Sequence, residues 1–249
     1  MYNFLKQIIN NVFPKQFIAK HKTKLRKVVA VFYKGSEYSC NICEFKMRKF
    51  ITSKNGLMIC PKCGSLSRTR QLWEVINTEI KNKVVLHFSP TLALKHKLEQ
   101  SDASNYVSTD YQGEFEADKT LNIEAIDEPD ASFDIAICYH VLEHVNNDIK
   151  AMSELYRILK PNGICYIQTP FKDGDIYEDT TIIKPEDRLQ HFGQEDHVRV
   201  YSIKGLKSRL ESVGFTVKLK NTGYETGNTF GFSEEETIII ATKPFKLKA

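Results

Sequence analysis

Residues 130–145, Asp-Ala-Ser-Phe-Asp-Ile-Ala-Ile-Cys-Tyr-His-Val-Leu-Glu-His-Val, decide the fold of this chain. Their centre, 133–138, is an apolar run with the length and composition of a buried β-strand. Residues 147–159 follow with the spacing of an amphipathic helix, which Pro161-Asn162-Gly163 should end. A buried strand followed closely by such a helix predicts one unit of an alternating α/β fold.

The same alternation extends outward from this stretch in both directions. Ser202 is a suitable N-cap and Gly214 a suitable end for a helix between them. Only a loop joins the last two strands, so we expect them to be antiparallel neighbours. The fold class is therefore α/β, with a mainly parallel sheet and helices on both faces. The other expected helices are 67–80 and 91–100, and the other expected strands are 83–88, 106–109, 164–169, 215–220 and 236–242.

Length and charge suggest how the chain is organised. Its 249 residues suit one α/β domain with a small appendage. The net charge is only +4, but the first 30 residues contain seven Lys or Arg and no acid, so the remainder is slightly acidic. We expect a basic amphipathic segment over 1–36, a cysteine module over 37–66 and the main domain over 67–249.

The N-terminal segment has three interpretations. Residues 2–13 place apolar side chains on one helical face, Pro14 follows, and 15–27 are basic. The helix could dock on the protein itself, the first 30 residues could contact a membrane surface or a partner, or the basic arm could contact RNA. The sequence has no secretory signal and no apolar run long enough to span a bilayer. We therefore expect a cytoplasmic, reducing location without a disulfide framework.

Four cysteines have the spacing of a metal site. Cys40-x2-Cys43 and Cys60-x2-Cys63, separated by 16 residues, match a tetrahedral zinc site with four thiolates. Such a closed site is structural, because no position remains for water. Iron in the same cage and two disulfides are the alternatives. The remaining cysteines, Cys138 and Cys165, lie in apolar strands and are expected in the core.

Three segments together resemble the type-11 methyltransferase family of class I enzymes. They are 130–145 quoted above, 154–163 with the sequence Glu-Leu-Tyr-Arg-Ile-Leu-Lys-Pro-Asn-Gly, and Gln168-Thr-Pro170. With the flanking strands, the resemblance extends over about residues 80–242. It implies a Rossmann-like, seven-stranded sheet with an antiparallel last strand. It also implies S-adenosylmethionine (SAM) as the methyl donor.

The resemblance also implies where SAM would bind. Asp110, after the second strand, would accept hydrogen bonds from the ribose hydroxyls, as the open edge of such a sheet allows. Asn122 and the backbone of Ile123 would contact the adenine, with Asp118 as a rival for this role. Tyr139 and His140 would flank the sulfonium, and Phe88 and Ser89 belong to the first cofactor loop. That loop departs from the family, because His87 and Ser89-Pro90-Thr91 replace its acid and glycines. A similar Leu-His-Phe-x-Pro loop occurs in a branch of methyltransferase-like proteins.

Residues 188–201 form a second polar cluster, which in this fold overhangs the transferred methyl group. Of its histidines, His197 is the first candidate for a general base and His191 the second. Arg199 could hold an anionic acceptor. A polar network that only fixes the loop is an equal alternative. Arg68 and Arg70, after the cysteine module, could face the cofactor cleft or lie at a solvated helix start.

These observations leave three functions to separate. The first is methyl transfer from SAM to a small-molecule or sugar-like acceptor. The second is an RNA methyltransferase that uses the zinc module and the basic arm, although no RNA-reading motif is present. The third is a catalytically silent binding protein that keeps the fold. The sequence identifies neither the acceptor nor the oligomeric state.

Overall fold

The computed structural model describes residues 15–53, 56–224 and 227–245, and it divides into two compact units. We call the first the cysteine unit; it comprises the described residues of Met1–Thr78, Ala93–Gln100 and Thr222–Glu236. We call the second the sheet unit; it comprises those of Glu79–Leu92, Ser101–Asn221 and Thr237–Ala249. The helix expected over 2–13 lies outside the described residues. The domain boundary expected at residue 67 stays a prediction.

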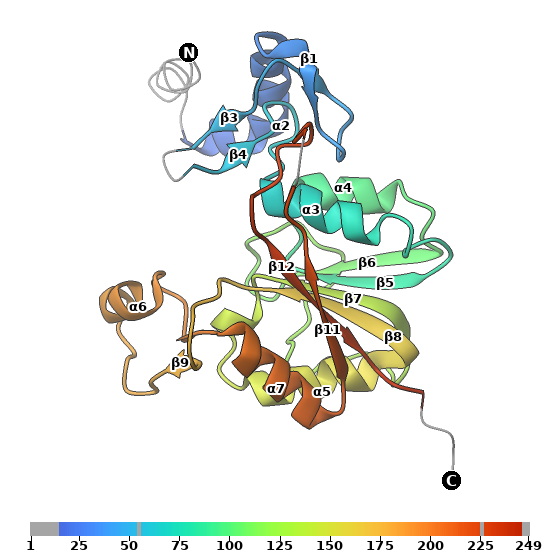
Figure 1. Ribbon diagram of the computed structural model, residues 1–249, viewed down its shortest axis with the longest axis vertical. Helices are drawn as coiled ribbons and strands as arrows, with labels where there is room; N and C mark the ends of the chain where they lie inside the picture. The colour runs from blue at the N-terminus through green and yellow to red at the C-terminus, as the bar shows by residue number, and fades with distance from the viewer. Residues whose placement is uncertain (1–14, 54–55, 225–226, 246–249) are drawn as a thin grey trace. The chain divides into compact units, whose positions relative to one another are not determined.

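The sheet unit is built on one six-stranded sheet in the order β11-β12-β8-β7-β5-β6 (Figure 1). β5 pairs in parallel with both β6 and β7, and β7 pairs in parallel with β8. β12 is antiparallel to both of its neighbours, which confirms the antiparallel end of the sheet. The strands are β5 (Val84–Phe88), β6 (Asn105–Thr109), β7 (Phe133–Tyr139), β8 (Leu159–Gln168), β11 (Thr216–Asn221) and β12 (Thr237–Thr242).

The main sheet of the described residues has one strand fewer than the seven implied by the family resemblance. The segment after β6 forms only isolated bridges among the described residues, Thr109 with Lys119 and Asn122 with Ala125. Its apolar side chains, Leu121 and Ile123, are buried in the core, but polar residues separate them and no longer apolar run follows. The segment is therefore too short to add a further ladder, and β6 is the edge of the sheet.

Two helices pack together in the sheet unit, α5 (Asp148–Ile158) and α7 (Ile203–Val213), and Figure 1 shows them side by side. The Asn147 side chain caps α5 by accepting a hydrogen bond from the Lys150 amide, and Ser202 caps α7 in the same way. Gly214 ends α7 in the left-handed conformation, as expected. The core joins these helices to the strands and includes Leu86, Ala136, Cys138, Met152, Leu155, Cys165, Ile167, Leu206, Leu210 and Ile239.

Pro161-Asn162-Gly163, which were expected to end the preceding helix, do not form a loop. Helix α5 ends at Ile158, but β8 begins immediately at Leu159 and includes these three residues. A register shift in the pairing with β7, between Phe133 and Ile135, accommodates them, and Asn162 has a φ of 62°. The turn residues therefore produce an irregular start to a long strand.

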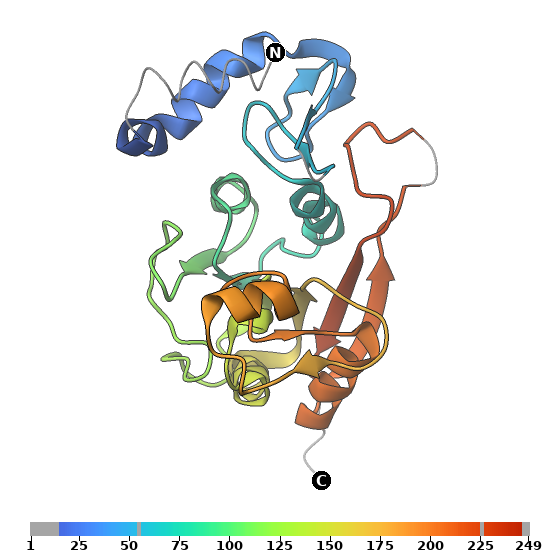
Figure 2. The same cartoon turned by 90° about the vertical axis from the view of Figure 1, so that its left-hand side faces the viewer.

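An insertion between β8 and α7 carries the second polar cluster of the sequence. It contains β9 (Tyr177–Glu178), α6 (Pro185–Phe192) and β10 (Arg199–Val200), and β9 pairs antiparallel with β10. In Figure 2, α6 lies in front of the sheet. The short 3-10 helix η1 (Leu142–His144) after β7 contacts β10. The insertion therefore meets the turn that follows β7.

The cysteine unit consists of short elements. They are α2 (Lys15–Val31), β1 (Lys34–Ser39), β2 (Lys46–Met47), β3 (Ile51–Thr52), β4 (Met58–Ile59), α3 (Ser67–Ile76) and α4 (Leu92–Glu99). β1 pairs with β2 and β3 pairs with β4, both antiparallel. The basic stretch of the sequence is thus part of a helix. Among the described residues, no helix combines the length and the apolarity needed to cross a bilayer.

Candidate functional site

The sheet has a topological switch point at β5. The chain runs from β5 to β6 on one side and then crosses to β7 on the other side. Ligands of open α/β sheets bind beyond the carboxyl ends of the strands at such a point. The residues that follow β5, β6 and β7 are Ser89, Asp110 and His140, so three of the predicted cofactor residues share this edge.

Ser89 takes the place of a glycine in the first loop. Its φ is 46°, in the left-handed region that favours glycine, and its amide donates to the Thr109 carbonyl at 2.7 Å. Its hydroxyl donates to Asp110 Oδ1 at 2.8 Å. This bond ties the ends of β5 and β6 together, so the loop keeps the glycine-like backbone without the glycine. Phe88, the residue before it, is buried in the core.

Asp110 is held by its own loop. Its Oδ2 accepts hydrogen bonds from the amides of Glu114 at 2.8 Å and Phe115 at 3.3 Å, while Oδ1 accepts from Ser89. The side chain is largely buried, with 6% of the residue exposed. Each carboxylate oxygen can accept more than one hydrogen bond, so the arrangement fixes the carboxylate and still allows it to accept ribose hydroxyls.

His87 cannot replace the charge of the acid usual at its position. It is buried, and burial lowers its pKa to about 3, so the ring is neutral near pH 7. Its Nδ1 lies 3.1 Å from the Tyr106 hydroxyl on β6. His87 therefore links two strands and carries no charge toward the cofactor edge.

The residues expected at the adenine differ in what holds them. Asp118 Oδ2 accepts from the Ser108 amide at 2.8 Å and from its hydroxyl at 2.6 Å, so this carboxylate fixes the segment beside β6. Asn122 Oδ1 accepts from the Glu124 amide at 2.9 Å, and the Ile123 side chain is buried. These contacts favour a structural role for Asp118, and the adenine contacts of Asn122 and Ile123 stay predictions.

Buried polar atoms without a partner gather at the same edge. Thr91 Oγ1, His140 Nε2 and Gln168 Oε1 are each buried without a hydrogen bond in the described structure. His140 has a φ of 54°, and its amide donates to the Gln168 carbonyl at 2.8 Å, so the turn after β7 is fixed against the end of β8. Tyr139 is the half-buried last residue of β7. Such atoms normally find partners, so a polar cofactor such as SAM fits this edge.

The structure brings together side chains from η1 and from the loop before β10. The rings of His144 and His197 meet edge to face with centroids 4.7 Å apart, and His144 Nδ1 lies 3.0 Å from Asp196 Oδ2. Glu143 Oε1 lies 3.2 Å from His140 Nδ1. Burial opposes ionisation of Glu143, but the hydrogen bond and charge of His140 outweigh it and lower its pKa. Burial and the neighbouring His144 lower the pKa of His197.

Arg199 fixes the turn after β7. Its Nη1 donates to two backbone carbonyls, those of Leu142, at 3.1 Å, and Val145. Its Nη2 donates to the Asn146 carbonyl at 2.9 Å, and its Nε donates to the Glu178 carboxylate at 2.9 Å. Four of its five N–H groups are therefore used within the protein. These contacts favour the polar-network interpretation over binding of an anionic acceptor.

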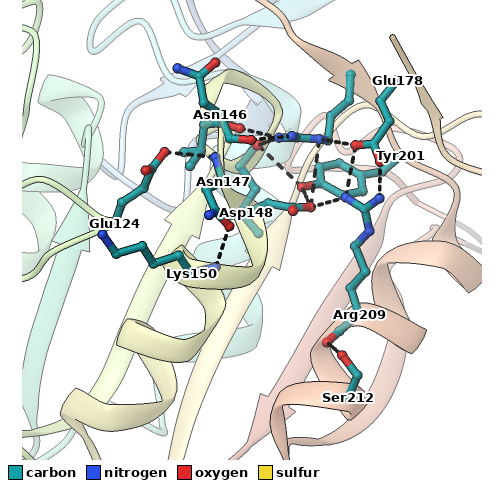
Figure 3. Close-up of polar contacts among 12 residues, drawn as sticks. Glu124, Asn146, Asn147, Asp148, Lys150, Glu178, Tyr201, Arg209 and Ser212 are labelled. Carbon is teal, nitrogen blue, oxygen red and sulfur yellow. Dashed lines mark hydrogen bonds and ion pairs between the residues drawn. The ribbon is translucent and has the colours of Figure 1, made fainter. Parts of the chain in front are cut away.

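The same network reaches helix α7, as Figure 3 shows. Buried Asp148 accepts from the Tyr201 hydroxyl at 2.6 Å and from Arg209, which also pairs with Glu178. The network thus joins the insertion to α5 and α7. His191, by contrast, is exposed on α6, and its Nδ1 lies 2.7 Å from the Tyr177 hydroxyl.

Glu178 should make the stability of the sheet unit depend on pH. Hydrogen bonds from Arg209 and Arg199 lower its pKa to about 2. A carboxyl whose pKa is depressed in the folded state stabilises it above the unfolded pKa, and this contribution disappears as the pH falls toward the folded pKa. We expect Glu178→Gln to lower the free energy of unfolding at pH 6, with a deficit that shrinks between about pH 4.5 and pH 2. Urea unfolding across this range measures it, with exposed Glu195→Gln as control; a pH-independent deficit would contradict the prediction.

The four predicted metal-ligating cysteines come together in the cysteine unit. Their sulfur atoms all lie within 4.8 Å of one another, and Cys40–Cys63 and Cys43–Cys60 are each 3.7 Å apart. Zinc–sulfur bonds of about 2.3 Å place two corners of a tetrahedron about 3.8 Å apart, so the cage fits zinc. The separation far exceeds a disulfide bond, and all four are free thiols.

The two cysteine turns have the same backbone plan. In each turn, the carbonyl of the first cysteine accepts a hydrogen bond from the amide four residues later. The Glu44 amide donates to the Cys40 carbonyl at 2.7 Å, and the Gly64 amide donates to the Cys60 carbonyl at 2.9 Å. Both donors have positive φ, 59° and 80°. Beneath them Arg70 is buried and donates to carbonyls of the unit, which rules out the solvated position considered for it.

Sequence comparison identifies the family. The sequence model of a family described as a methyltransferase domain matches residues 62–219, which is more than half of the chain. The chain belongs to this family. A probable S-adenosylmethionine-dependent methyltransferase of Mycolicibacterium smegmatis is 31% identical over 101 residues. That match covers 39% of this chain and only 34% of the relative, so the chain aligns with about a third of it.

Solved structures show the same fold. The YcgJ protein of Bacillus subtilis has a TM-score of 0.53 at 16% identity, over 71% of this chain and 99% of that one. A 1,6-didemethyltoxoflavin-N1-methyltransferase of Burkholderia thailandensis, solved with S-adenosylhomocysteine, has a TM-score of 0.50 at 16% identity, over 71% of this chain and 78% of that one. At these identities the likeness establishes the Rossmann-like fold and nothing finer.

Glu143 and His144 were not among the residues predicted for the site, and Asp196 was included only as part of the 188–201 cluster. In the sequence, Glu143 and His144 were noted only as part of the segment 140–144, which contributes to the family resemblance. Its association with His197 depends on a backbone bond from the Val198 amide to the Glu143 carbonyl, 2.9 Å long. No periodicity of the sequence encodes a contact of this kind.

Proposed function

We propose that this chain is a methyltransferase that uses SAM and acts on a small-molecule acceptor. The observation that carries the proposal is the position of Asp110, fixed by Ser89 and by two loop amides at the switch point of the sheet. The family match and the unpaired buried atoms of the neighbouring loops support it.

SAM would supply an electrophilic methyl group on a sulfonium. Asp110 would orient its ribose, and the turn at Tyr139 and His140 would border the methyl group. Methyl transfer is an in-line displacement, so the main task of the protein's residues would be to align the acceptor with the methyl group. Arg199 holds the carbonyls of the turn after β7, and in this way it would position His140 and Glu143.

We also propose that the four cysteines hold a structural zinc ion. The site offers four sulfur ligands, which leaves no position for a reactant. The Ser65 hydroxyl lies 3.3 Å from Cys40 Sγ and 3.2 Å from Cys63 Sγ, and such outer hydrogen bonds stabilise bound thiolates. The cytoplasmic location expected from the sequence stays a prediction.

Calorimetric titration of the full chain with SAM tests the methyltransferase proposal. We expect saturable binding, and S-adenosylhomocysteine should compete for the same site. No heat of binding at about 1 mM SAM, roughly 4 kcal/mol of affinity, would leave the silent binding protein as the better interpretation. RNA affinity that falls steeply with salt would instead favour the RNA methyltransferase.

A further inference from the structure

Three side chains beside the proposed cofactor edge have the composition of a metal site. Glu143, His144 and His197, which we call the Glu–His–His cluster, each offer one ligand atom, and these atoms lie within 4.8 Å of one another. Glu143 and His197 are 1% and 3% exposed. Ligands on one ion at about 2.1 Å are roughly 3–3.5 Å apart, so small side-chain movements would close the site.

His197 has one ring nitrogen without a hydrogen-bond partner in the described structure. Its Nδ1 lies 3.2 Å from the Phe192 carbonyl, which can only accept, so Nδ1 carries the proton. The Nε2 lone pair is then free, and this atom is buried without a hydrogen-bond partner. A carbonyl that fixes the tautomer of a histidine in this way is typical of metal-ligating histidines.

His144 is oriented by a carboxylate. Its Nδ1 lies 3.0 Å from Asp196 Oδ2, so Nδ1 again donates, and in the neutral ring Nε2 carries the lone pair. Metal-bound histidines commonly donate their other nitrogen to a carboxylate, which also makes the ligating nitrogen more basic. Two histidines with the same protonation pattern therefore meet in the cluster.

Glu143 completes the pattern. One oxygen, Oε1, contacts His140 Nδ1 at 3.2 Å, and the other, Oε2, is buried without a partner. Unpaired buried acceptors cost free energy, and here a carboxylate oxygen and an imidazole nitrogen are both unpaired. Because a cation would pair with every lone pair in the cluster, bound metal accounts for an arrangement that hydrogen bonding leaves incomplete.

We propose that Glu143, His144 and His197 bind a divalent first-row transition-metal ion, separate from the zinc of the cysteine unit. Two imidazoles and one carboxylate suit Mn²⁺, Fe²⁺ or Zn²⁺, and three protein ligands leave coordination positions open. His197 then serves as a ligand in place of the base expected from the sequence. If the proposed function holds, the open positions would take an oxygen of the acceptor.

Mn²⁺ titration of the full chain, followed by the electron paramagnetic resonance of free Mn²⁺, tests the site. Mn²⁺ is a suitable probe because thiolates favour zinc, so the cysteine site keeps its own ion. We expect one equivalent to bind. His197→Gln should weaken binding at least about 100-fold, while the exposed His191→Gln should leave it unchanged. No binding to the unaltered chain, or equal binding by both variants, overturns the proposal.

Asp196→Asn keeps the test decisive if the buried variant does not fold. The Asp196 side chain is half exposed and pairs with His144 without being one of the three ligands, so the fold should tolerate the change. We expect Mn²⁺ affinity to fall about 10- to 100-fold, because outer-shell partners of metal ligands have effects of this size. Unchanged affinity would contradict the site. SAM titration of the same sample, by calorimetry, reports separately on the proposed function.

Discussion

Cys40→Ser is expected to release zinc and to unfold the cysteine unit locally. A structural zinc site contributes about 10–16 kcal/mol of binding free energy in small zinc modules, and that free energy is folding free energy. The other stabilising features of the unit are small ones: a core cluster around Val29, Tyr33 and Ile51, two short antiparallel pairs and the hydrogen bonds of Arg70. Loss of one thiolate should therefore disorder the module at temperatures where the sheet unit remains folded.

Two measurements separate this outcome from general destabilisation. Metal analysis should find that the change removes about one zinc per chain. Trp73, the single tryptophan of the chain, lies on α3 in the cysteine unit, and its fluorescence should report the local unfolding. The matched control is Cys165→Ala, a buried thiol in β8, which should keep its zinc. A Cys40→Ser chain that keeps as much zinc as the unaltered chain, or an unaltered chain without any, would refute the zinc site.

Local rules explain why most of the sheet unit could be predicted. β7, α5 and α7 follow from short apolar runs, amphipathic spacing and the helix-end residues Ser202 and Gly214. The cysteine spacing likewise predicted the four-cysteine cluster from local sequence. Each Cys-x2-Cys pair forms a turn that is closed by backbone hydrogen bonds within the turn itself. The missing seventh strand could not be foreseen, because a resemblance transfers a strand count that the residues after β6 do not support.

Arg70 shows what such rules miss. Its side chain is fully buried, and its donors reach the carbonyls of Phe230 and Gly231, about 160 residues away in sequence. A charged residue at a helix start is usually solvated, so nothing local marks this one as central. The Glu–His–His cluster is similar: its third ligand, His197, comes from a distant loop that only the folded chain brings near η1.

Asp110→Ala is expected to reduce SAM affinity by at least about 100-fold, since hydrogen bonds to a charged group contribute about 1.5–3 kcal/mol each and the ribose offers two hydroxyls. The physical reason is specific to the carboxylate: Ser89 and two amides already hold it in place, so it accepts further donors without losing side-chain entropy on binding. Calorimetry with SAM measures the change.

The neighbouring side chains separate a cofactor contact from support of the loop. Ser89→Ala removes one donor to Asp110 but leaves both carboxylate oxygens, and this bond is present with or without SAM, so SAM affinity should change by less than about 10-fold. Asp118→Asn weakens the contacts to Ser108 and should lower the melting temperature while leaving SAM affinity nearly unchanged. If Asp118→Asn abolished binding and Asp110→Ala did not, Asp118 would be the cofactor carboxylate. Equal losses in all three variants would mean that loop order, and not a charge at Asp110, governs binding.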